Sequence, residues 1–324
     1  MTSAGPLVIV GDVLLDIDID GRADRRSPDG PVPVVDVTTI AHRPGGAGLA
    51  ATLAAHDTGE VVLVAGFADD ESGHRLRALL SHRVELVELP FSGSTVCKER
   101  VRAVGPCAGG ESGFAPITRL DFGHGRIVAG PLSAEVRSVL ANARAVLVAD
   151  YGRGAAAHPQ IRTLLEQRSR RTPLVWDPHP KGPAPVPGAD LVTPNRPETE
   201  QLVPDSSGFG ARARELARRW SARAVTITLG ADGAVLSYAD RPAVRIPVPV
   251  GESGSEQARD TCGAGDRFAV AATIAMSAGA SAEDAVRHAV AAASAFVADG
   301  AATSFADAAS QVCAPELAGS DPNR

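Results

Sequence analysis

Two acids bracket two glycines in residues 260–266, DTCGAGD, directly before an alanine-rich stretch with helical periodicity. Gly263, Ala264 and Gly265 carry little or no side chain, so a ligand can approach their backbone closely. A helix that begins here leaves free N–H groups at its positive end, and such an end binds anions. Asp266 would repel a phosphate, but it makes sense as a base that takes a proton from a hydroxyl while the N–H groups hold the transferred group. The segment therefore predicts phosphoryl transfer.

An ordinary helix start is the alternative for the same residues. Asp260 or Thr261 would then be the N-cap, and Asp266 would be a first-turn acid that complements the helix dipole. Spacing alone leaves both interpretations open. They are compatible, because a helix start is also the source of the free N–H groups.

A second candidate site lies in residues 193–198, TPNRPE, after a short apolar run. Asn195 and Glu198 are three residues apart, so both side chains can face one side of a turn. Their oxygens suit Mg²⁺, which keeps much of its hydration and binds bridging phosphates, so we expect them to hold the ion through water. A helix start is again the alternative.

These segments belong to a chain in which strands and helices alternate. Near-continuous apolar runs are typical of strands buried on both faces of a parallel sheet that helices cover. Strands are expected at 7–11, 61–67, 145–150, 173–177, 190–195 and 224–230, and helices at 47–57, 70–82, 132–142, 158–170, 208–221, 265–278 and 282–298. Ligands bind at the carboxyl ends of such strands, so we expect Asp12, Asp150, Asp177 and Asn195 at one rim. Any one of them could instead be a cap or turn residue.

Two regions break this alternation. Residues 12–40 and 91–122 contain strand-like pieces without a helix signal, which predict a small antiparallel sheet that covers the rim. We therefore expect one large domain over residues 1–310, with these two regions as its lid, and a C-terminal tail at 311–324.

Composition narrows the class of protein. The 324 residues have a net charge of -6, which argues against nucleic acid as a bulk partner and favours small metabolites. The four cysteines have no CxxC spacing and are few for this length, which argues against a disulfide framework or a structural zinc site, so we expect the reducing cytoplasm. Neither a secretory leader nor a membrane span is recognisable at the start.

Other motifs bear on the kind of ligand. The sequence contains neither the G-x-x-x-x-G-K-[ST] of a Walker nucleotide site nor the G-x-S-x-G of many hydrolases. Residues 44–51, PGGAGLAA, match G-x-G-x-x-A, but IAHRP precedes them rather than a buried strand, which disfavours a dinucleotide fingerprint. A glycine pair that lets a small ligand approach the backbone fits this segment better.

In their order along nearly the whole chain, these motifs resemble the ribokinase-like (PfkB) family of sugar kinases. DTCGAGD resembles the family's C-terminal signature and PGGAGLAA its N-terminal glycine motif. Within the family, GDVLLD, SPDGPVPVVDV, RPGGAG, RLDF, VADYGRG, DPHPKG and LVTPN are most similar to the heptose 7-phosphate kinases of ADP-heptose synthesis. The resemblance implies a doubly wound α/β fold with a mostly parallel sheet, and a β-sheet lid that forms a homodimer.

The resemblance also implies roles for particular residues. Asp266 would deprotonate the anomeric hydroxyl of D-glycero-D-manno-heptose 7-phosphate, and the backbone at Gly263, Ala264 and Gly265 would form the anion hole. The product would be the 1,7-bisphosphate, and the cofactors ATP and Mg²⁺. Residues on the nucleotide side would be Asn195, Glu198, Thr228, Gly230, Gly233 and Thr261, with Asn195 and Glu198 also at the metal. The sugar or its phosphate would be bound by Asp16, Gly45, Gly46, Lys98, Arg119, Asp121, Asp150 and Lys181.

One departure from the family affects the substrate. The glycine motif of the family usually continues with an asparagine that binds sugar hydroxyls, and Leu49 stands at that position here. A lost polar contact in a buried site is costly, so the sugar could be held differently or be another sugar. The alternatives are another PfkB sugar or nucleoside kinase, a noncatalytic sugar- or nucleotide-binding regulator, and a dinucleotide oxidoreductase.

Overall fold

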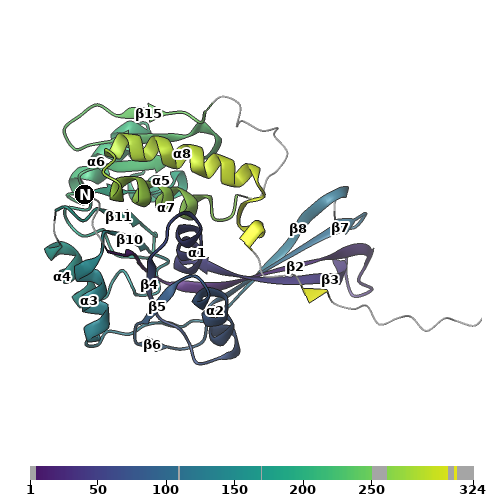
Figure 1. Ribbon diagram of the computed structural model, residues 1–324. Helices are drawn as coiled ribbons and strands as arrows, with labels where there is room; N and C mark the ends of the chain where they lie inside the picture. Colours follow the sequence, from purple (N-terminus) through teal and green to yellow (C-terminus); the bar gives the residue numbers. More distant parts are fainter. Residues whose placement is uncertain (1–4, 109, 169, 250–260, 306–309, 312–324) are drawn as a thin grey trace, which may run out of the picture.

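A central sheet carries the strands that the apolar runs predict (Figure 1). The computed structural model describes residues 5–108, 110–168, 170–249, 261–305 and 310–311. The strands follow the order β15-β14-β13-β12-β11-β10-β1-β4-β5. Their bounds are β1 Leu7–Gly11, β4 Val61–Ala65, β5 Glu85–Glu88, β10 Ala145–Ala149, β11 Leu174–Asp177, β12 Leu191–Val192, β13 Val225–Thr228, β14 Ala234–Ser237 and β15 Val244–Ile246. Neighbours from β5 to β13 pair in parallel, and β14 and β15 add an antiparallel edge.

Both faces of this sheet are buried because successive side chains of a strand point to opposite faces. In β1, Leu7 and Ile9 belong to one apolar cluster, and Val8 and Val10 belong to another. A strand that must supply two cores has no place for an alternating polar residue, which explains the continuous apolar runs of the sequence.

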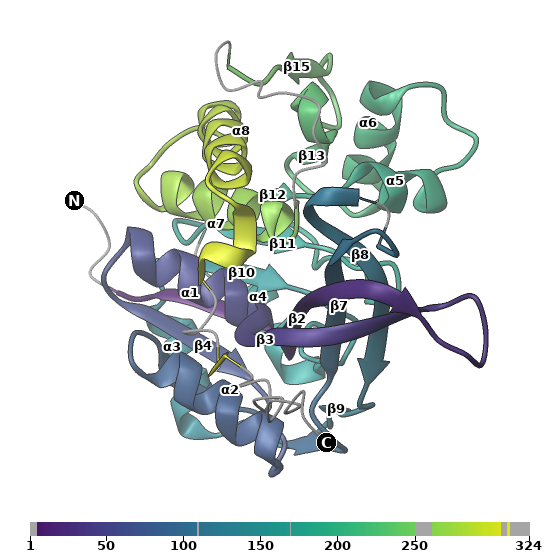
Figure 2. The same ribbon diagram turned by 90° about the vertical axis from the view of Figure 1, so that its right-hand side faces the viewer.

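Helices cover each face of the sheet (Figures 1 and 2). The cluster on one face includes residues of α1 (Ala47–Asp57), α2 (Glu71–Ser81), α7 (Ala264–Ser277) and α8 (Ala282–Ala298). The cluster on the other face includes residues of α3 (Ala134–Asn142), α4 (Pro159–Gln167), α5 (Arg196–Leu202) and α6 (Phe209–Arg219). The molecule is therefore an α/β sandwich in three layers, as the sequence predicts.

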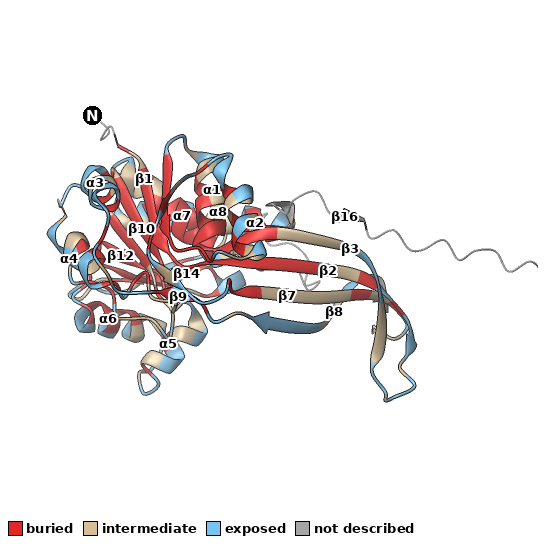
Figure 3. Cartoon of the chain, turned by 90° about the horizontal axis from the view of Figure 1, so that it is seen from below, coloured by how far each residue is buried: buried red, intermediate tan, exposed pale blue. Residues whose placement is uncertain are grey.

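A second sheet extends from the end of this body (Figure 3). Its order is β16-β3-β2-β7-β8, with β2 Val13–Arg26, β3 Pro33–Gly46, β7 Cys97–Gly105, β8 Gly110–Phe122 and β16 Ser310–Gln311. The prediction of an antiparallel sheet is wrong in one respect, because β2 and β7 pair in parallel. The two hairpins come from separate parts of the chain and lie side by side in the same direction, which the sequence of each hairpin cannot reveal. We refer to this sheet as the lid sheet.

The lid sheet has one charged face and one apolar face. Cross-strand partners share a face, and in register from β3 through β2 and β7 to β8 the charged face carries Arg43, Asp16, Lys98 and Asp121. The adjacent row on the opposite face includes Leu15, Cys97 and Phe122. Two large side chains of this apolar face are exposed to solvent: Leu120 is 42% exposed and Phe122 is 51% exposed.

Some boundaries differ from the predicted ones. Strand β3 continues to Gly46, so a strand does precede the PGGAGLAA motif, although it belongs to the lid sheet and not to the central sheet. The predicted tail begins within β16, whose Gln311 pairs with Thr39, and residues 312–324 lie outside the described part of the chain. Among the described helices, none is both long and apolar enough to cross a membrane.

Candidate active site

Asp266 lies in the first turn of α7, with only 6% of its surface exposed. The N-cap of α7 is Gly263, which has a φ of 82°. Glycine has no side chain that could accept a hydrogen bond from the N–H groups of the helix, and none of the other described side chains caps it. Thr261 is thus not the N-cap, and Asp260 lies outside the described residues. Since no side chain caps the helix, its first turn offers backbone N–H groups to a ligand. The carboxylate and these N–H groups therefore occupy one turn.

The predicted anion hole is not uniform. The N–H of Ala264 donates to the carbonyl of Thr261 at 3.1 Å, so it is engaged within the turn. Gly265 is exposed, and a Cβ there would have no atom within 4 Å. Gly263 is confined from behind, since a Cβ at this position would lie 2.6 Å from Cδ2 of Leu49. Of the three residues, Gly265 therefore has the most open backbone, and Ala264 is the least suitable to donate its N–H to an anion.

Burial raises the pKa of Asp266 to about 7. The hydroxyl of Tyr151 opposes this shift by donating to both carboxylate oxygens, at 2.8 Å to Oδ1 and 3.0 Å to Oδ2. A carboxylate with a pKa near neutrality is suited to accept a proton at neutral pH. Tyr151 was not among the predicted site residues, although it stands within VADYGRG, one of the segments that carry the family resemblance.

Asp12 fixes the loop that carries Tyr151. It follows β1, and its carboxylate accepts the backbone N–H groups of Tyr151 at 3.1 Å, Arg153 at 2.9 Å and Ala155 at 3.0 Å. Three such bonds satisfy a buried carboxylate and give the loop one conformation. Asp12 therefore has a structural role at the rim, where it holds the loop of residues 151–155 in place.

Further carboxylates gather at the ends of the neighbouring strands. Burial raises the pKa of Asp150 to about 7, and the charges of Asp12 and Glu198 act in the same direction. Burial also raises the pKa of Asp177 well above its usual range, with added effects of Asp266 and Glu198. Mutual repulsion of this kind makes the rim receptive to positive charge or to hydroxyl donors.

Asp16 lies on the lid sheet between two arginines. Its Oδ2 accepts from Nη1 of Arg43 at 2.8 Å, and its Oδ1 from Nη1 of Arg100 at 2.6 Å. Arg43 is fully buried and also donates to Asp18 at 3.2 Å and to Sγ of Cys262 at 3.4 Å. Arg43 thereby connects the lid sheet to the DTCGAGD segment. It was not a predicted site residue.

The two glycines of PGGAGLAA lie between the lid sheet and the rim. A Cβ at Gly45 would lie 2.6 Å from Oδ2 of Asp16. Gly46 has a φ of 61°, and a Cβ there would lie 2.6 Å from the carbonyl of Asp12 and 3.3 Å from the ring of Tyr151. Side chains at either position would enter the space around Asp16 and Tyr151, so both glycines keep the site open.

Lys98 and Lys181 occupy different surroundings. The Nζ atom of Lys98 lies 5.6 Å from the centroid of the Tyr151 ring, and burial lowers its pKa. Lys181 is exposed, and its Cβ lies near Gly152 on the loop that carries Tyr151. The structure thus brings Lys98 close to Tyr151 and Asp266 and leaves Lys181 exposed at the outer edge.

Arg119 and Asp121 pair with each other on the charged face of the lid sheet. The guanidinium of Arg119 donates to the Asp121 carboxylate at 2.7 and 2.5 Å, and both side chains are more than half exposed. Both residues act electrostatically on Lys98. They therefore lie beside the site and not inside it.

Asn195 and Glu198 form a capping box at the start of α5. The Oδ1 of Asn195 accepts the N–H of Glu198 at 3.0 Å, and Oε2 of Glu198 accepts the N–H of Asn195 at 2.9 Å. The helix start that the sequence left as an alternative is thus present. Oε1 of Glu198 takes no part in the cap, and burial raises the pKa of this carboxyl.

The loop after β13 lies next to this capping box. Asn195 forms an isolated parallel bridge with Thr228, whose N–H donates to the carbonyl of Pro194 at 3.1 Å. Gly230 has a φ of 61° with open space around it, and Gly233 closes the turn by donating to the carbonyl of Gly230 at 3.0 Å. Of the two glycines, Gly230 therefore leaves room for a ligand, and Gly233 shapes the turn into β14.

Within the described residues, no three His, Cys, Asp or Glu side chains are arranged to hold a metal ion by themselves. The donors near the rim are hard oxygens, and Glu198 retains one carboxylate oxygen outside its cap. Oxygen donors that are too few to enclose an ion fit Mg²⁺, because Mg²⁺ is bound by one or two carboxylates together with water and phosphates.

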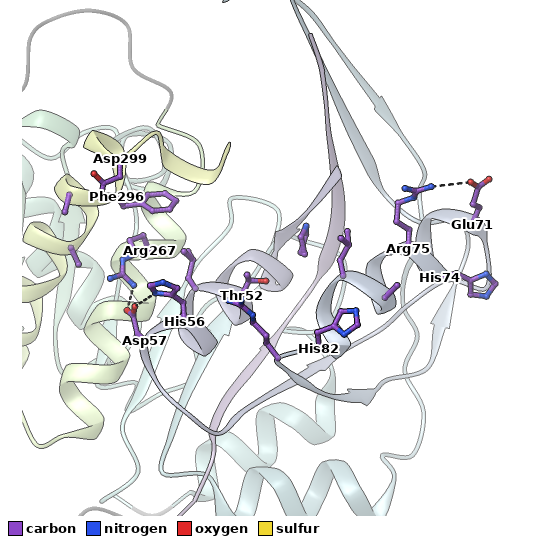
Figure 4. Close-up of a pocket in the computed structure, with 17 residues that line it drawn as sticks. Thr52, His56, Asp57, Glu71, His74, Arg75, His82, Arg267, Phe296 and Asp299 are labelled. Carbon is purple, nitrogen blue, oxygen red and sulfur yellow. Dashed lines mark hydrogen bonds and ion pairs between the residues drawn. The ribbon is translucent and has the colours of Figure 1, made fainter. Parts of the chain in front are cut away.

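A cavity of about 1210 Å³ opens elsewhere, between α1, α2, α7 and α8 (Figure 4). Its walls include His56, His82 and Phe296, and the ion pair between Arg267 and Asp57 crosses one end of it. None of the predicted site residues lines this cavity. The size of a cavity is thus a poor guide here, and the titratable groups at the strand ends mark the candidate active site.

Comparisons with known proteins identify the family of the chain. Residues 131–309 match the model of the "pfkB family carbohydrate kinase". The chain is 46% identical over 317 residues to "Bifunctional protein HldE" of Streptomyces coelicolor, covering 96% of this chain and 64% of the relative. It is 32% identical over 282 residues to the protein of the same name from Pseudomonas aeruginosa, covering 85% of this chain and 56% of the relative. The chain therefore spans less than two thirds of the length of these relatives.

Solved structures show the same fold. The ribokinase of Arabidopsis thaliana complexed with ribose and ATP matches with a TM-score of 0.64 and 22% identity, covering 93% of this chain and 95% of that chain. The Escherichia coli phosphofructokinase-2 in complex with substrates and products matches with a TM-score of 0.62 and 19% identity, covering 90% and 93%. The predicted ribokinase-like fold class is confirmed.

Proposed function

Because this chain belongs to the pfkB family of carbohydrate kinases, we propose that it transfers the γ-phosphoryl group of ATP to the anomeric hydroxyl of D-glycero-D-manno-heptose 7-phosphate. The product would be the heptose 1,7-bisphosphate, a precursor of nucleotide-activated heptose. The observation that carries the proposal is Asp266, a buried carboxylate with a pKa near 7, in the first turn of a helix whose N-terminus no side chain caps.

In this mechanism Asp266 accepts the proton of the attacking hydroxyl. The N–H groups at Gly263 and Gly265 hold the transferred phosphoryl group at the positive end of α7, with Ala264 contributing less because its N–H is engaged. Mg²⁺, when bound with ATP, would neutralise charge on the phosphates, and we assign it to Asn195 and Glu198 through water. Thr228, Gly230, Gly233 and Thr261 would line the nucleotide side.

The charged face of the lid sheet supports a substrate that carries both hydroxyls and a phosphate. Asp16, Gly45 and Gly46 would face the sugar, and Asp150 would accept from one of its hydroxyls. Lys98 and Arg119 would attract the phosphate that is not transferred, because cations on a partly desolvated face bind such a group well. Asp121 would orient Arg119, and Lys181 would close the outer edge of the site.

The apolar face of the lid sheet supports a homodimer. Leu120 and Phe122 lie exposed on the face opposite the charged one. Exposed apolar side chains gathered on one sheet face are typical of an interface between subunits. We propose that two copies pair through this face and that the enzyme works in the cytoplasm.

A phosphorylation panel tests the substrate. Purified protein with ATP and Mg²⁺ is offered heptose 7-phosphate, ribose, fructose 1-phosphate and a nucleoside, and ADP release is measured. We expect the largest kcat/KM with heptose 7-phosphate. Turnover of another acceptor without turnover of heptose 7-phosphate would refute the substrate and retain the kinase class.

A second kinase function follows from Leu49. This residue is only 2% exposed, and it packs in the apolar cluster against Gly263 instead of facing a ligand. The site therefore lacks a polar side chain at position 49, which favours a sugar whose hydroxyls are held from the lid sheet. If the panel shows that another sugar phosphate is the preferred substrate, the apolar side chain of Leu49 would explain that result.

A further inference from the structure

The hydroxyl of Tyr151 contacts the carboxylate of Asp266 directly. We propose that Tyr151 is a positioning residue that holds the Asp266 carboxylate in its ionised, proton-accepting form and aims it at the substrate hydroxyl. The inference rests on the proposed function, since it assumes that Asp266 is the base. It adds a residue that works on the base through a hydrogen bond.

The geometry fixes which group donates. Tyr151 has one hydroxyl proton, and its oxygen lies 2.8 Å from Oδ1 and 3.0 Å from Oδ2 of Asp266. An ionised carboxylate only accepts hydrogen bonds, so the phenol must be the donor. A carboxylate has about four acceptor positions, and one phenol leaves room for the hydroxyl of a substrate. The contact thus stabilises the base without blocking it.

The surroundings of Tyr151 leave its hydroxyl little freedom. Its backbone N–H is bound by Asp12 at 3.1 Å. Its ring stacks beside that of His179, with centroids 6.4 Å apart, and lies beneath the ammonium of Lys98. Gly46 faces the ring from the glycine motif. Four segments of the chain therefore fix the position of one hydroxyl, which is the arrangement expected of a group that must hold a partner.

The other charged groups that face Asp266 come from several elements. Asp16 on β2 and Asp177 at the end of β11 oppose its ionisation, whereas Lys98 on β7 and Arg43 on β3 favour it. Burial is the largest effect and raises the pKa of Asp266, while the Tyr151 hydrogen bond is the next largest and lowers it. Removal of the hydroxyl alone should therefore raise the pKa further, since the other groups remain.

Tyr151→Phe removes the hydroxyl and keeps the ring that packs against Lys98 and His179. The pKa of Asp266 can be read without substrate by a carbon NMR titration of protein labelled with [4-13C]aspartate, in which Asp266→Asn identifies the resonance. We expect the titration midpoint to rise by about one pH unit in Tyr151→Phe. Tyr238, the second of the two tyrosines, gives the matched control, and Tyr238→Phe should leave the midpoint unchanged. An unchanged midpoint in Tyr151→Phe, or an equal rise in both variants, would overturn the inference.

Kinetics supply the second readout. The acidic limb of the kcat/KM profile should move upward by the same interval in Tyr151→Phe, with activity largely recovered at high pH. A loss that is uniform across pH would indicate a merely structural role and count against the inference. If Tyr151→Phe does not fold, protein made with 3-fluorotyrosine gives a test of opposite sign. Its more acidic hydroxyl is a stronger donor, so the midpoint should fall, and a constant midpoint would refute the role.

The two arms separate the inference from the proposed function. A shifted NMR midpoint in a protein that phosphorylates no sugar would remove the kinase assignment and leave the Tyr151–Asp266 interaction in place. Turnover of sugar with an unshifted midpoint would remove the role of Tyr151 and leave the kinase assignment in place.

Discussion

Replacement of Asp266 by asparagine should strongly reduce turnover and also stabilise the protein. Asparagine has nearly the same shape, and its Oδ1 can still accept from the hydroxyl of Tyr151. It cannot accept the proton of a substrate hydroxyl, so we expect kcat to fall by roughly 10²- to 10⁴-fold. ATP binding should be largely retained, because the nucleotide-side residues are unchanged.

The stabilisation follows from the raised pKa of Asp266, which is about 7 in the folded protein against a usual 3.8. Between these values the folded state holds a proton that the unfolded state releases, so wild-type stability decreases as pH rises from about 4 to 7. The difference of about three units between the folded and unfolded pKa lowers the free energy of unfolding of the wild type by about 4 kcal/mol at pH 8. Asparagine has no such dependence, so Asp266→Asn should be more stable than the wild type by about that amount.

Urea unfolding of both proteins at pH 8, 5 and 3 measures the difference. We expect the gain in unfolding free energy to be largest at pH 8, smaller at pH 5 and close to zero at pH 3. Asp205→Asn serves as the control, because Asp205 is exposed and lies between α5 and α6, away from the site. Two results would refute the reasoning that ionisation of the buried Asp266 destabilises the fold: equal unfolding free energies of Asp266→Asn and wild type at pH 8, or a gain in unfolding free energy that does not depend on pH.

Three further predictions concern the lid sheet and the metal. Arg43→Met leaves two buried aspartates without their shared cation and should cost about 3 to 5 kcal/mol in urea unfolding, whereas Arg25→Met breaks only an exposed pair and should leave the free energy of unfolding nearly unchanged; similar costs would contradict the buried network. Glu198→Gln should raise the Mg²⁺ concentration for half-maximal activity about tenfold, as expected for a weakened ligand, and an unchanged Mg²⁺ dependence would exclude Glu198 from the metal site. Phe122→Glu should convert the dimer to a monomer in sedimentation velocity, while Val128→Glu, a substitution at an exposed residue outside the lid sheet, should not; a monomeric wild type would refute the dimer.

Local patterns predicted most of the fold. The buried strands β1, β4 and β10 and the helices α7 and α8 lie within a residue or two of their expected positions, because their periodicity is strong and their burial is uniform. Strand β12 has two residues, and α5 starts within a segment that was interpreted as a metal motif. Short elements of this kind depend on their neighbours more than on their own sequence.

The candidate site was less predictable because its contacts join distant segments. The sequence marked Asp266 through its glycines, but Tyr151, its hydrogen-bond partner, is 115 residues away in the chain. Arg43 is 219 residues from Cys262. Neither contact produces a recognisable spacing of residues within one segment of the sequence. Both Tyr151 and Arg43 nevertheless lie in segments that the family resemblance covers. The sequence predicted that the two regions form one sheet, but not that β2 and β7 pair in parallel, for the same reason.

The contact between Leu49 and Gly263 bears on any attempt to redesign the sugar preference of this enzyme. Leu49 fills the space behind the DTCGAGD loop, and a side chain at position 263 would collide with it. Asparagine at position 49 would place an amide among apolar neighbours and leave a void beneath the start of α7, whose first turn carries Asp266. A polar sugar contact therefore cannot be introduced here by one substitution. A variant library that aims at new acceptors should randomise position 49 together with the residues around 263, because Leu49 in α1 and Gly263 at the start of α7 pack against each other.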